Sequence, residues 1–558
     1  MRTEFFNIPA EILDAVSKRL EQWQSINLVE RLWTKDATLW KKDPKDHKEL
    51  ADRLGWLQLP FEIKTGISEF EIFANSVKTK FSHVLLLGMG GSSLCPEVLS
   101  KTFGSSEGYP LLSIVDTTHP QVIREIEDKY DLTKTLFIMA SKSGGTAETL
   151  SFFYRFYDAL GKIIDNPGDN FIALTDPGTS LEKLAIEKKF LKTFSTPTEV
   201  GGRYSALTPF GLVPAALMGI NLDDFAYECS EFANTIKSTN LQDNLGVYLG
   251  ALIGECSLNG IDKLPFFVSP QISSYPQWVE QLVAESTGKE GKGILPVEGE
   301  HFSDISNYGR DRLFIFTFLD GDSNFELSNH FEKVKNSGFP ILKTTFQNKY
   351  QLAAELFKWE VATAISGIVL QINPFDQPDV QIAKTLANEG LAEYQKNGSL
   401  PKSEPNAVFE NIEVYADSTS DSLSETISSF MSNLLNDEYV ALLNFVPYGD
   451  DIEKAIAQIR KNLFEKYKVT ITNGFGPRFL HSTGQLHKGG SSKCRFIQIT
   501  SEIQNDVEVP NKGYSFGTLI TAQALGDLKA LKNNQRKCMR INIKGSLVES
   551  LKIIANSI

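Results

Sequence analysis

Residues 85–100 read LLLGMGGSSLCPEVLS: an apolar run, a Gly-rich turn and an amphipathic segment. This order is typical of a buried strand that leads through a tight turn into a helix. Such a turn exposes backbone N–H groups at the start of the helix, a geometry that suits an anion. A dinucleotide fingerprint would need a third glycine where Ser93 stands, which argues against a dinucleotide cofactor. The alternative to an anion site is a tight strand-to-helix turn that binds no ligand.

The same rhythm continues on both sides of this stretch. The runs HVLLLGMGG, PLLSIVD, TLFIMAS and NFIALTD are separated by amphipathic segments of about one helix each, which predicts an α/β domain with a parallel sheet over 81–244. A second α/β domain is expected over 245–415, with PFFVSP and RLFIFTFLD as strands. Residues 1–80 carry apolar positions at helical spacing and predict a helical N-terminal segment. The Ser/Asp/Thr-rich residues 416–429 predict a linker, and 430–558 predict an extra C-terminal α/β region.

Composition narrows the function classes. The 558 residues hold 56 Lys and Arg against 69 Asp and Glu, and the net charge of −13 gives no basic field for nucleic acid. The five cysteines are scattered and never in CxxC spacing, which argues against a disulfide framework or a thiolate zinc site and favours a reducing cytoplasm. The N-terminus lacks the order of a signal peptide, and no run reaches the ~18 apolar residues of a membrane helix. We therefore expect a cytoplasmic protein with no membrane or nucleic-acid partner.

A second Gly/Ser-rich loop, ASKSGGTAET at 140–149, also follows a predicted strand. Its hydroxyls and glycine amides could wrap a phosphate dianion without metal; the hydroxyl-bearing residues are Ser141, Ser143 and Thr146. The alternative is a helix start with Ser and Thr caps and Glu148 in the first turn. Because ligands of parallel sheets lie outside the carboxyl ends of the strands, both Gly-rich loops could serve one site.

Two further stretches carry charged residues in unusual settings. Arg203 follows two glycines in EVGGRYSALTPFGL, where backbone can approach a ligand and Arg supplies permanent charge. Glu285 lies on a helical pattern with Gln281 in QWVEQLVAESTGKEGKG. Taken alone, Glu285 could be a surface carboxylate and Arg203 a salt-bridge partner.

The C-terminal part adds a lysine and two histidines. Lys384 in LQINPFDQPDVQIAK falls inside a helix that restarts after Pro378, where a lone lysine is usually solvated. GFGPRFLHSTGQLHKGG forms a basic patch with His481 and His487. Their spacing does not match a helical zinc pair, and no Cys or acidic partner lies near, so no metal is expected.

Taken in order, GMGGSSLCPE, SKSGGTAET, VGGRYSALTPFGL, QLVAESTGK and NPFDQPDVQIAK resemble the phosphoglucose isomerase family. The resemblance covers roughly residues 80–390, and GPRFLHSTGQLHKGG is similar to the isomerase half of bifunctional transaldolase/phosphoglucose isomerase fusions. It implies two tandem flavodoxin-like sugar isomerase (SIS) domains and a homodimer without cofactor. The implied activity is the interconversion of glucose 6-phosphate and fructose 6-phosphate through an enediolate. The alternatives are an isomerase that also accepts mannose 6-phosphate, on which Thr287 could bear, and a non-catalytic sugar phosphate sensor.

The resemblance also implies roles for single residues. Glu285 matches the catalytic base, Arg203 the transition-state arginine and Lys384 the lysine on the ring-opening side. The remaining matches would bind the sugar phosphate: Gly91, Ser92, Ser141, Lys142, Ser143, Thr146, Glu148 and Gln281. The sequence departs from the family pattern at Asp379 and Gln381, before Lys384. For the histidine that opens the sugar ring, we prefer His487 to His301.

Overall fold

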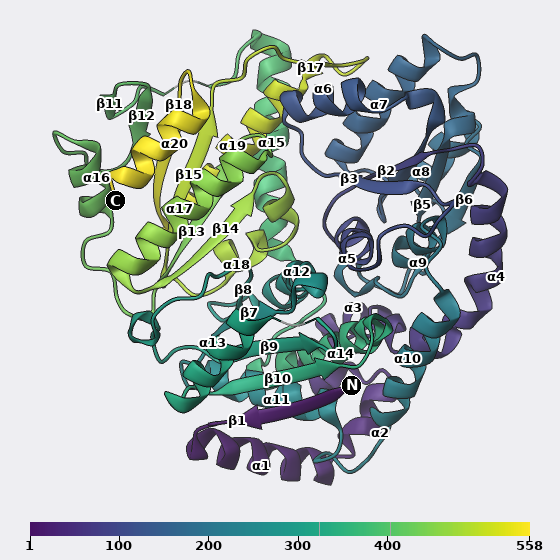
Figure 1. Ribbon diagram of the computed structural model, residues 1–558, viewed down its shortest axis with the longest axis vertical. Coiled ribbons are helices and arrows are strands. Elements are labelled where there is room, and N and C mark those ends of the chain that lie inside the picture. Colours follow the sequence, from purple (N-terminus) through teal and green to yellow (C-terminus); the bar gives the residue numbers. More distant parts are fainter. Residues whose placement is uncertain (323, 402) are drawn as a thin grey trace. The chain divides into compact units, whose positions relative to one another are not determined.

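The computed structural model describes residues 1–322, 324–401 and 403–558, and the chain divides into two units (Figure 1). The first unit comprises Met1–Asp116, Tyr130–Glu300 and Asp311–Asp376. The second comprises Thr117–Lys129, His301–Arg310 and Gln377–Ile558. Both units combine helices with largely parallel sheets, so the predicted α/β class is confirmed.

The first sheet of unit 1 is entirely parallel. Its strands, in spatial order, are β3 (Leu111–Val115), β2 (His83–Gly88), β4 (Thr135–Ala140), β5 (Phe171–Thr175) and β6 (Lys192–Ser195). The helices of this part are α5 (Leu94–Phe103), α7 (Ala147–Gly161), α8 (Ser180–Glu187) and α9 (Pro209–Leu217). β4 is buried at every position, as expected for a strand of a parallel sheet covered on both faces. Counted from β2, the strand order is 2-1-3-4-5, the flavodoxin-like order that the resemblance implied.

The second sheet of unit 1 has four parallel strands in the corresponding order, 2-1-3-4 counted from β7, and one antiparallel edge strand. Its strands are β1 (Arg2–Phe6), β10 (Ile341–Phe346), β9 (Phe314–Leu319), β7 (Lys263–Val268) and β8 (Leu295–Val297), in spatial order. The helices of this part are α11 (Leu245–Leu258), α12 (Tyr275–Thr287), α13 (Phe325–Asn336) and α14 (Leu352–Leu370). α14 is buried along its whole length and packs against α11, α10 (Leu222–Thr235) and α12, which makes it the central helix of the unit.

The N-terminal segment is mostly helical, as the spacing predicted, but it starts with a strand. Its helices are α1 (Ala10–Ser25), α2 (Leu28–Trp33), α3 (Pro44–Asp52) and α4 (Leu59–Val77). β1 pairs antiparallel with β10 at the edge of the second sheet (Figure 1). Its two phenylalanines point to opposite faces, as strand geometry requires: Phe5 packs on Tyr248 and Phe6 on Phe331.

Unit 2 is built on a mixed sheet. Its strands, in spatial order, are β11 (Ala407–Phe409), β12 (Ile412–Tyr415), β18 (Lys537–Ile543), β15 (Cys494–Ser501), β13 (Tyr439–Phe445) and β14 (Thr470–Phe475). A small hairpin joins β16 (Glu508–Val509) to β17 (Tyr514–Ser515). The helices are α6 (Pro120–Lys129), α15 (Pro378–Asn397), α16 (Leu423–Phe430), α17 (Asp450–Tyr467), α18 (Gly484–Gly489), α19 (Phe516–Asn533) and α20 (Leu547–Asn556).

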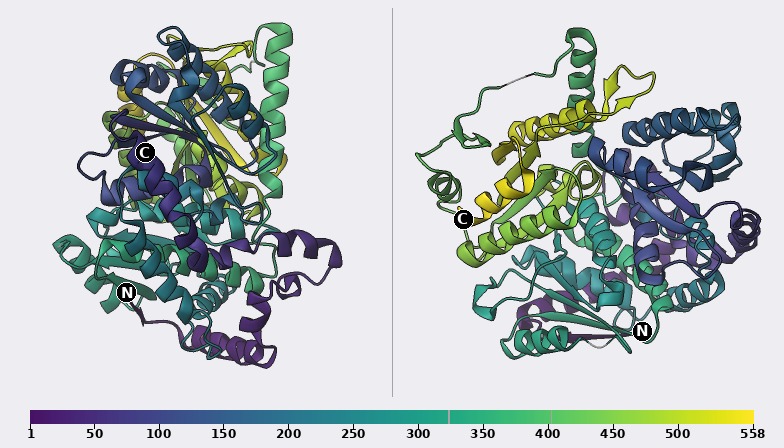
Figure 2. Two further views of the ribbon diagram at one scale, coloured as in Figure 1. Left: turned by 90° about the vertical axis from the view of Figure 1, so that its right-hand side faces the viewer. Right: turned by 45° about the horizontal axis from the view of Figure 1, so that its top comes forward.

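The unit boundaries differ from the sequence-based division. The last and longest segment of unit 2 begins at Gln377. The sequence had instead predicted that the second domain extends to residue 415 and that the C-terminal region begins at residue 430. The reason is that α15 packs along α19 of unit 2 (Figure 2). The expected linker at 416–429 contains the first turns of α16, because Ser422 caps that helix and Leu423 and Ile427 are buried.

All five cysteines are free and buried. Cys95, Cys229 and Cys256 belong to unit 1, and Cys494 and Cys538 belong to unit 2. Burial raises the pKa of each thiol above its ordinary value. Across residues 1–322, 324–401 and 403–558, no helix has both the length and the hydropathy that a membrane span requires.

Candidate active site

Unit 1 holds most of the residues that the sequence nominates, and unit 2 holds Lys384, His487, His481 and the alternative His301. Within the first sheet the strand order turns at β2, which has β3 on one side and β4 on the other. The two Gly-rich loops follow β2 and β4, so both start at the carboxyl ends of these neighbouring strands. This is the topological switch point at which open α/β sheets bind ligands.

The loop after β4 ends at the N-terminus of α7, as predicted. Ser141 and Thr146 share a hydrogen bond of 2.9 Å between their hydroxyl oxygens, while Ser143 is exposed. Gly144 has φ +71°, and a Cβ there would stand 2.7 Å from the backbone nitrogen of Leu181. The loop therefore needs glycine at this position, and it presents hydroxyls at the positive end of a 15-residue helix.

Two charged residues flank this loop. Lys142 is half-buried, pairs with Asp176 at 2.6 Å and donates to the carbonyl oxygen of Pro197 at 3.0 Å. Burial lowers the pKa of Lys142, although the pairing with Asp176 opposes the shift. Glu148 is buried in the first turn of α7, where a carboxylate is favoured by the helix dipole.

The loop after β2 braces the segment that carries Arg203. A Cβ atom at Gly91 would stand 2.0 Å from the carbonyl oxygen of Gly202, so only glycine permits this contact. The Ser205 hydroxyl donates to the same carbonyl oxygen of Gly202 at 2.6 Å. Ser92, next to Gly91, is 8% exposed. The first Gly-rich motif thus fixes the backbone beside Arg203.

Glu285 and Arg203 are brought together, although 82 residues separate them in sequence. Arg203 Nη1 lies 3.4 Å from Glu285 Oε1, and the two side chains are 3% and 12% exposed. One turn earlier on α12, Gln281 Nε2 donates to Glu285 Oε2 at 3.1 Å. Arg203 Nε also donates to Ser286 Oγ at 2.8 Å. Both oxygens of Glu285 are therefore oriented by neighbouring donors, and the carboxylate has little exposure to water.

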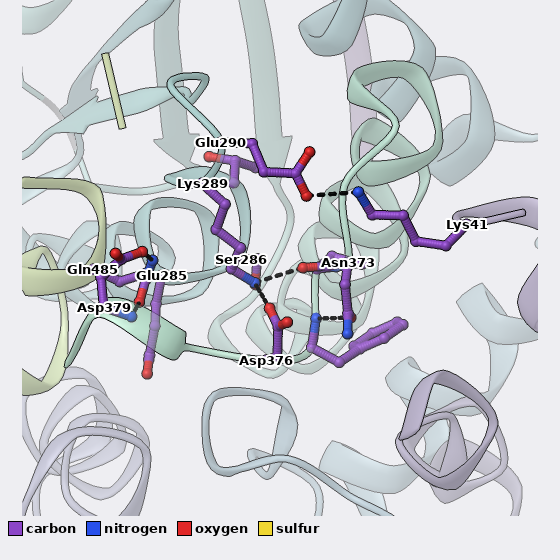
Figure 3. Close-up of polar contacts among 12 residues, drawn as sticks. Lys41, Glu285, Ser286, Lys289, Glu290, Asn373, Asp376, Asp379 and Gln485 are labelled. Atoms are coloured by element: carbon purple, nitrogen blue, oxygen red, sulfur yellow. Dashed lines mark hydrogen bonds and ion pairs between the residues drawn. The ribbon is translucent and has the colours of Figure 1, made fainter. Parts of the chain in front are cut away.

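The start of the stretch NPFDQPDVQIAK, in which only Lys384 had been assigned a role, completes this cluster. The carbonyl oxygens of Pro374 and Asp376 accept from Arg203 Nη2 at 2.8 Å and 2.9 Å. Lys289 is 3% exposed, donates to the carbonyl oxygen of Asn373 at 2.5 Å and pairs with Asp376 at 2.7 Å (Figure 3). The sequence offered only a weak signal for Lys289, because lysines in Gly-flanked turns are usually solvated.

The Thr287 side chain binds backbone groups, not Glu285 or Arg203. Its hydroxyl donates to the carbonyl oxygen of Val283 at 2.8 Å and accepts from the backbone nitrogen of Ile294 at 2.9 Å. The side chain is fully buried and serves the end of α12 and the chain that returns beside it. Thr287 therefore gives no structural support for broader selectivity at the sugar.

Lys384 and His487 of unit 2 lie in contrasting surroundings. Lys384 is exposed on α15. His487 is 2% exposed on α18, and its ring lies 5.1 Å from Phe496, 6.1 Å from Phe479 and 6.3 Å from Tyr439. Neither of its ring nitrogens has a hydrogen-bond partner within the described part of the chain. Burial, with smaller contributions from neighbouring cations, lowers the pKa of His487 well below its usual value.

Such an environment keeps the His487 imidazole neutral and enclosed, which does not suit a proton shuttle. His301, the alternative, packs edge-on against Phe464 at 5.5 Å, and burial lowers its pKa as well. His481 belongs to the same basic motif as His487 but is only half-buried, in the short turn Arg478–His481. Among the described residues, no cluster of His, Cys, Asp and Glu could hold a metal ion.

Comparisons with known proteins find one family. Residues 69–295 match the family model described as phosphoglucose isomerase. The glucose-6-phosphate isomerase of Carboxydothermus hydrogenoformans is 29% identical over 430 residues, which are 66% of this chain and 92% of that protein. That of Clostridium tetani is 27% identical over 404 residues, with 62% and 89% covered.

Solved structures share the fold. A hypothetical protein from Thermus thermophilus superposes with a TM-score of 0.60 at 24% identity, covering 70% of this chain and all of that one. A glucose-6-phosphate isomerase from Chlamydia trachomatis superposes with a TM-score of 0.52 at 19% identity, covering 66% and 78%.

Proposed function

Because the chain belongs to the phosphoglucose isomerase family, we propose that it interconverts glucose 6-phosphate and fructose 6-phosphate. The observation that carries the proposal is the buried pairing of Glu285 with Arg203, oriented by Gln281. A carboxylate held beside a permanent cation is what proton transfer through an enediolate needs.

In the proposed reaction Glu285 removes the proton from one of the two reacting carbons and returns it to the other. One base can serve both halves because C1 and C2 are adjacent. As the proton leaves, negative charge develops on the oxygens of the enediolate. Arg203 stabilises this charge more strongly in the transition state than in the ground state, and its preorganised donors require little reorientation.

The loop Ser141–Thr146 is proposed as the phosphate subsite. It combines hydroxyls, a nearby Lys142 and the N-terminus of α7, all of which favour a dianion. Binding energy from this remote group would hold the reacting carbons in place beside Glu285. Gly91 and Ser92, in the neighbouring loop, would line the sugar side of the same switch point.

Ring opening requires a proton to move between the ring oxygen and the C1 hydroxyl. By the family resemblance we propose Lys384 for this step. For the histidine we propose His481 in place of His487, because both stand in the same motif and His481 is half-buried whereas His487 is enclosed; His301, half-buried as well, stays the alternative. We also propose, from the family resemblance and the free cysteines, a homodimer in a reducing cytoplasm.

The proposal is tested by initial rates of fructose 6-phosphate conversion, coupled to NADPH formation, for the parent chain and Glu285→Gln. The amide keeps the shape of Glu285 but cannot take a proton, so kcat should fall by about a thousand-fold or more. Glu290→Gln is the matched control, since this carboxylate lies just beyond α12 and pairs at the surface with Lys41. A parent chain that binds fructose 6-phosphate without turning it over would refute the enzyme and favour a sensor.

A further inference from the structure

The residues that follow α12 form a tight two-residue turn. Lys289 and Lys292 exchange both backbone hydrogen bonds, at 3.1 Å and 2.9 Å, around Glu290 and Gly291. Both central residues have positive φ, 55° and 75°, as a type I′ turn requires. The start of the Lys289 side chain is therefore fixed. The second lysine of the turn leads elsewhere, because Lys292 Nζ donates to the carbonyl oxygen of Leu370 at the end of α14.

From this fixed turn the Lys289 side chain reaches the segment Asn373–Asp376 (Figure 3). Its ammonium group is nearly fully buried and is held by the carbonyl oxygen of Asn373 and the carboxylate of Asp376. Burial and the neighbouring guanidinium of Arg203 lower the pKa of Lys289 to about 7, while Asp376 and Glu285 oppose this shift. Burying this ammonium group costs desolvation free energy, which a solvated surface lysine does not lose.

The same segment receives Arg203. Its carbonyl oxygens at Pro374 and Asp376 bind Nη2, while Nε binds Ser286, so the guanidinium plane is fixed on two sides. The remaining nitrogen, Nη1, faces Glu285. Phe375 secures the segment from its other side, between the rings of Trp40 at 5.5 Å and Tyr204 at 5.3 Å.

Charge balance explains why the second cation is needed. Two carboxylates belong to this cluster: Glu285 pairs with Arg203, and Asp376, whose backbone carbonyl also accepts from Arg203, pairs through its side chain with Lys289. We expect that an Asp376 side chain without Lys289 would compete with Glu285 for Arg203. Lys289 pairs with Asp376 and so removes this competitor. Because Arg203 and Glu285 are 3% and 12% exposed, such a competition would be stronger than between two surface groups, although the Asp376 side chain itself is 31% exposed.

We infer that Lys289 is a positioning residue, which fixes the segment Asn373–Asp376 and thereby aims Arg203 at Glu285 and at the enediolate oxygen. The inference rests on the proposed isomerase reaction. Lys289 acts through Arg203, because its ammonium group is already occupied by Asn373 and Asp376. Neither the family resemblance nor the sequence pattern had assigned it a role.

The central test is Lys289→Met, which keeps the length of the side chain and removes its charge. Displacing a catalytic group by about 1 Å lowers rates on the order of 100-fold, so kcat should fall about 10- to 100-fold with KM changed less than about three-fold. Lys292→Met is the matched control in the same turn, because it also loses a bond to a backbone carbonyl but does not contact Arg203 or its loop. Its kcat should stay within about two-fold of the parent.

Inhibitor binding separates positioning from direct contact. Arabinonohydroxamate 5-phosphate mimics the enediolate oxygens, whereas glucitol 6-phosphate resembles the open-chain substrate. Lys289→Met should weaken the hydroxamate by the same factor as kcat and leave glucitol 6-phosphate within about three-fold, as expected for a group that acts only in the transition state. Equal weakening of both inhibitors would mean that Lys289 binds the substrate itself, and the inference would be wrong.

Asp376→Asn and the double variant Lys289→Met/Asp376→Asn guard against a misfolded single variant. The double variant is electroneutral, so it should fold even where the lone carboxylate does not. It should retain more kcat than Lys289→Met, because the competitor for Arg203 is gone, yet less than Asp376→Asn. A folded double variant with the parent's kcat would overturn the inference. An inactive parent chain would instead refute the proposed function, so the two failures can be told apart.

Discussion

Gly91→Ala should impair catalysis without touching any side chain of the candidate site. The new methyl group would stand 2.0 Å from the carbonyl oxygen of Gly202, and Cβ contacts below 3.0 Å essentially never occur. The segment before Arg203 must therefore move by at least 3.0 − 2.0 = 1.0 Å. A displacement of this size at a catalytic group lowers rates on the order of 100-fold, and the overpacking destabilises the fold by about 1–3 kcal/mol.

The assay compares kcat, KM and the urea midpoint of Gly91→Ala with those of Gly201→Ala. Gly201 also precedes Arg203, has φ −66°, and a Cβ there meets nothing within 4 Å in the described chain. The control should keep kcat within about three-fold of the parent. If folded Gly91→Ala matches Gly201→Ala in kcat, the first Gly-rich motif does not position Arg203 and the reasoning fails.

Three further predictions concern other residues. His481→Asn should lower the rate from cyclic substrate about 100-fold, whereas His487→Phe, in its aromatic surroundings, should stay within about three-fold; the reverse order would return the shuttle role to His487. Burial lowers the pKa of His330 from 6.5 to about 4. Between pH 6.5 and pH 4 this histidine therefore binds a proton in the unfolded chain but not in the folded protein, so the free energy of unfolding falls as the pH drops through this range. The loss amounts to about 3 kcal/mol, and urea midpoints at pH 7 and 4.5 should differ less in His330→Phe than in the parent. Lys142→Met should raise KM about ten-fold or more with a smaller change in kcat, because phosphate binding is lost equally from ground and transition states; an unchanged KM would place the phosphate elsewhere.

The α/β alternation could be predicted because strands of parallel sheets are short, apolar and evenly spaced along the chain. What escaped prediction depends on long-range contacts. β1 belongs to the second sheet only through pairing with β10, more than 330 residues later, and no local pattern announces this. In the same way α15 follows α14 closely in sequence but packs on α19, which moves the unit boundary to Gln377.

The candidate site divides along similar lines. Glu285, Gln281 and Arg203 stand in recognisable motifs, and the structure brings them together. Lys289 became visible only through its burial, and Asp376 only through its pairing with Lys289, since a lysine beside glycines and an aspartate before a helix are common in solvated turns. His487 as the ring-opening histidine stays a prediction, and the aromatic rings that enclose it could not be foreseen from its motif position.

The buried thiols can report when the structure around each of them unfolds. An alkylating reagent reacts with thiolates, and buried thiols of raised pKa present few of them, so modification should wait for the surrounding structure to open. Three such thiols lie in unit 1 and two in unit 2. Pulse alkylation followed by peptide mass spectrometry would therefore time the opening of each unit separately, without any engineered label.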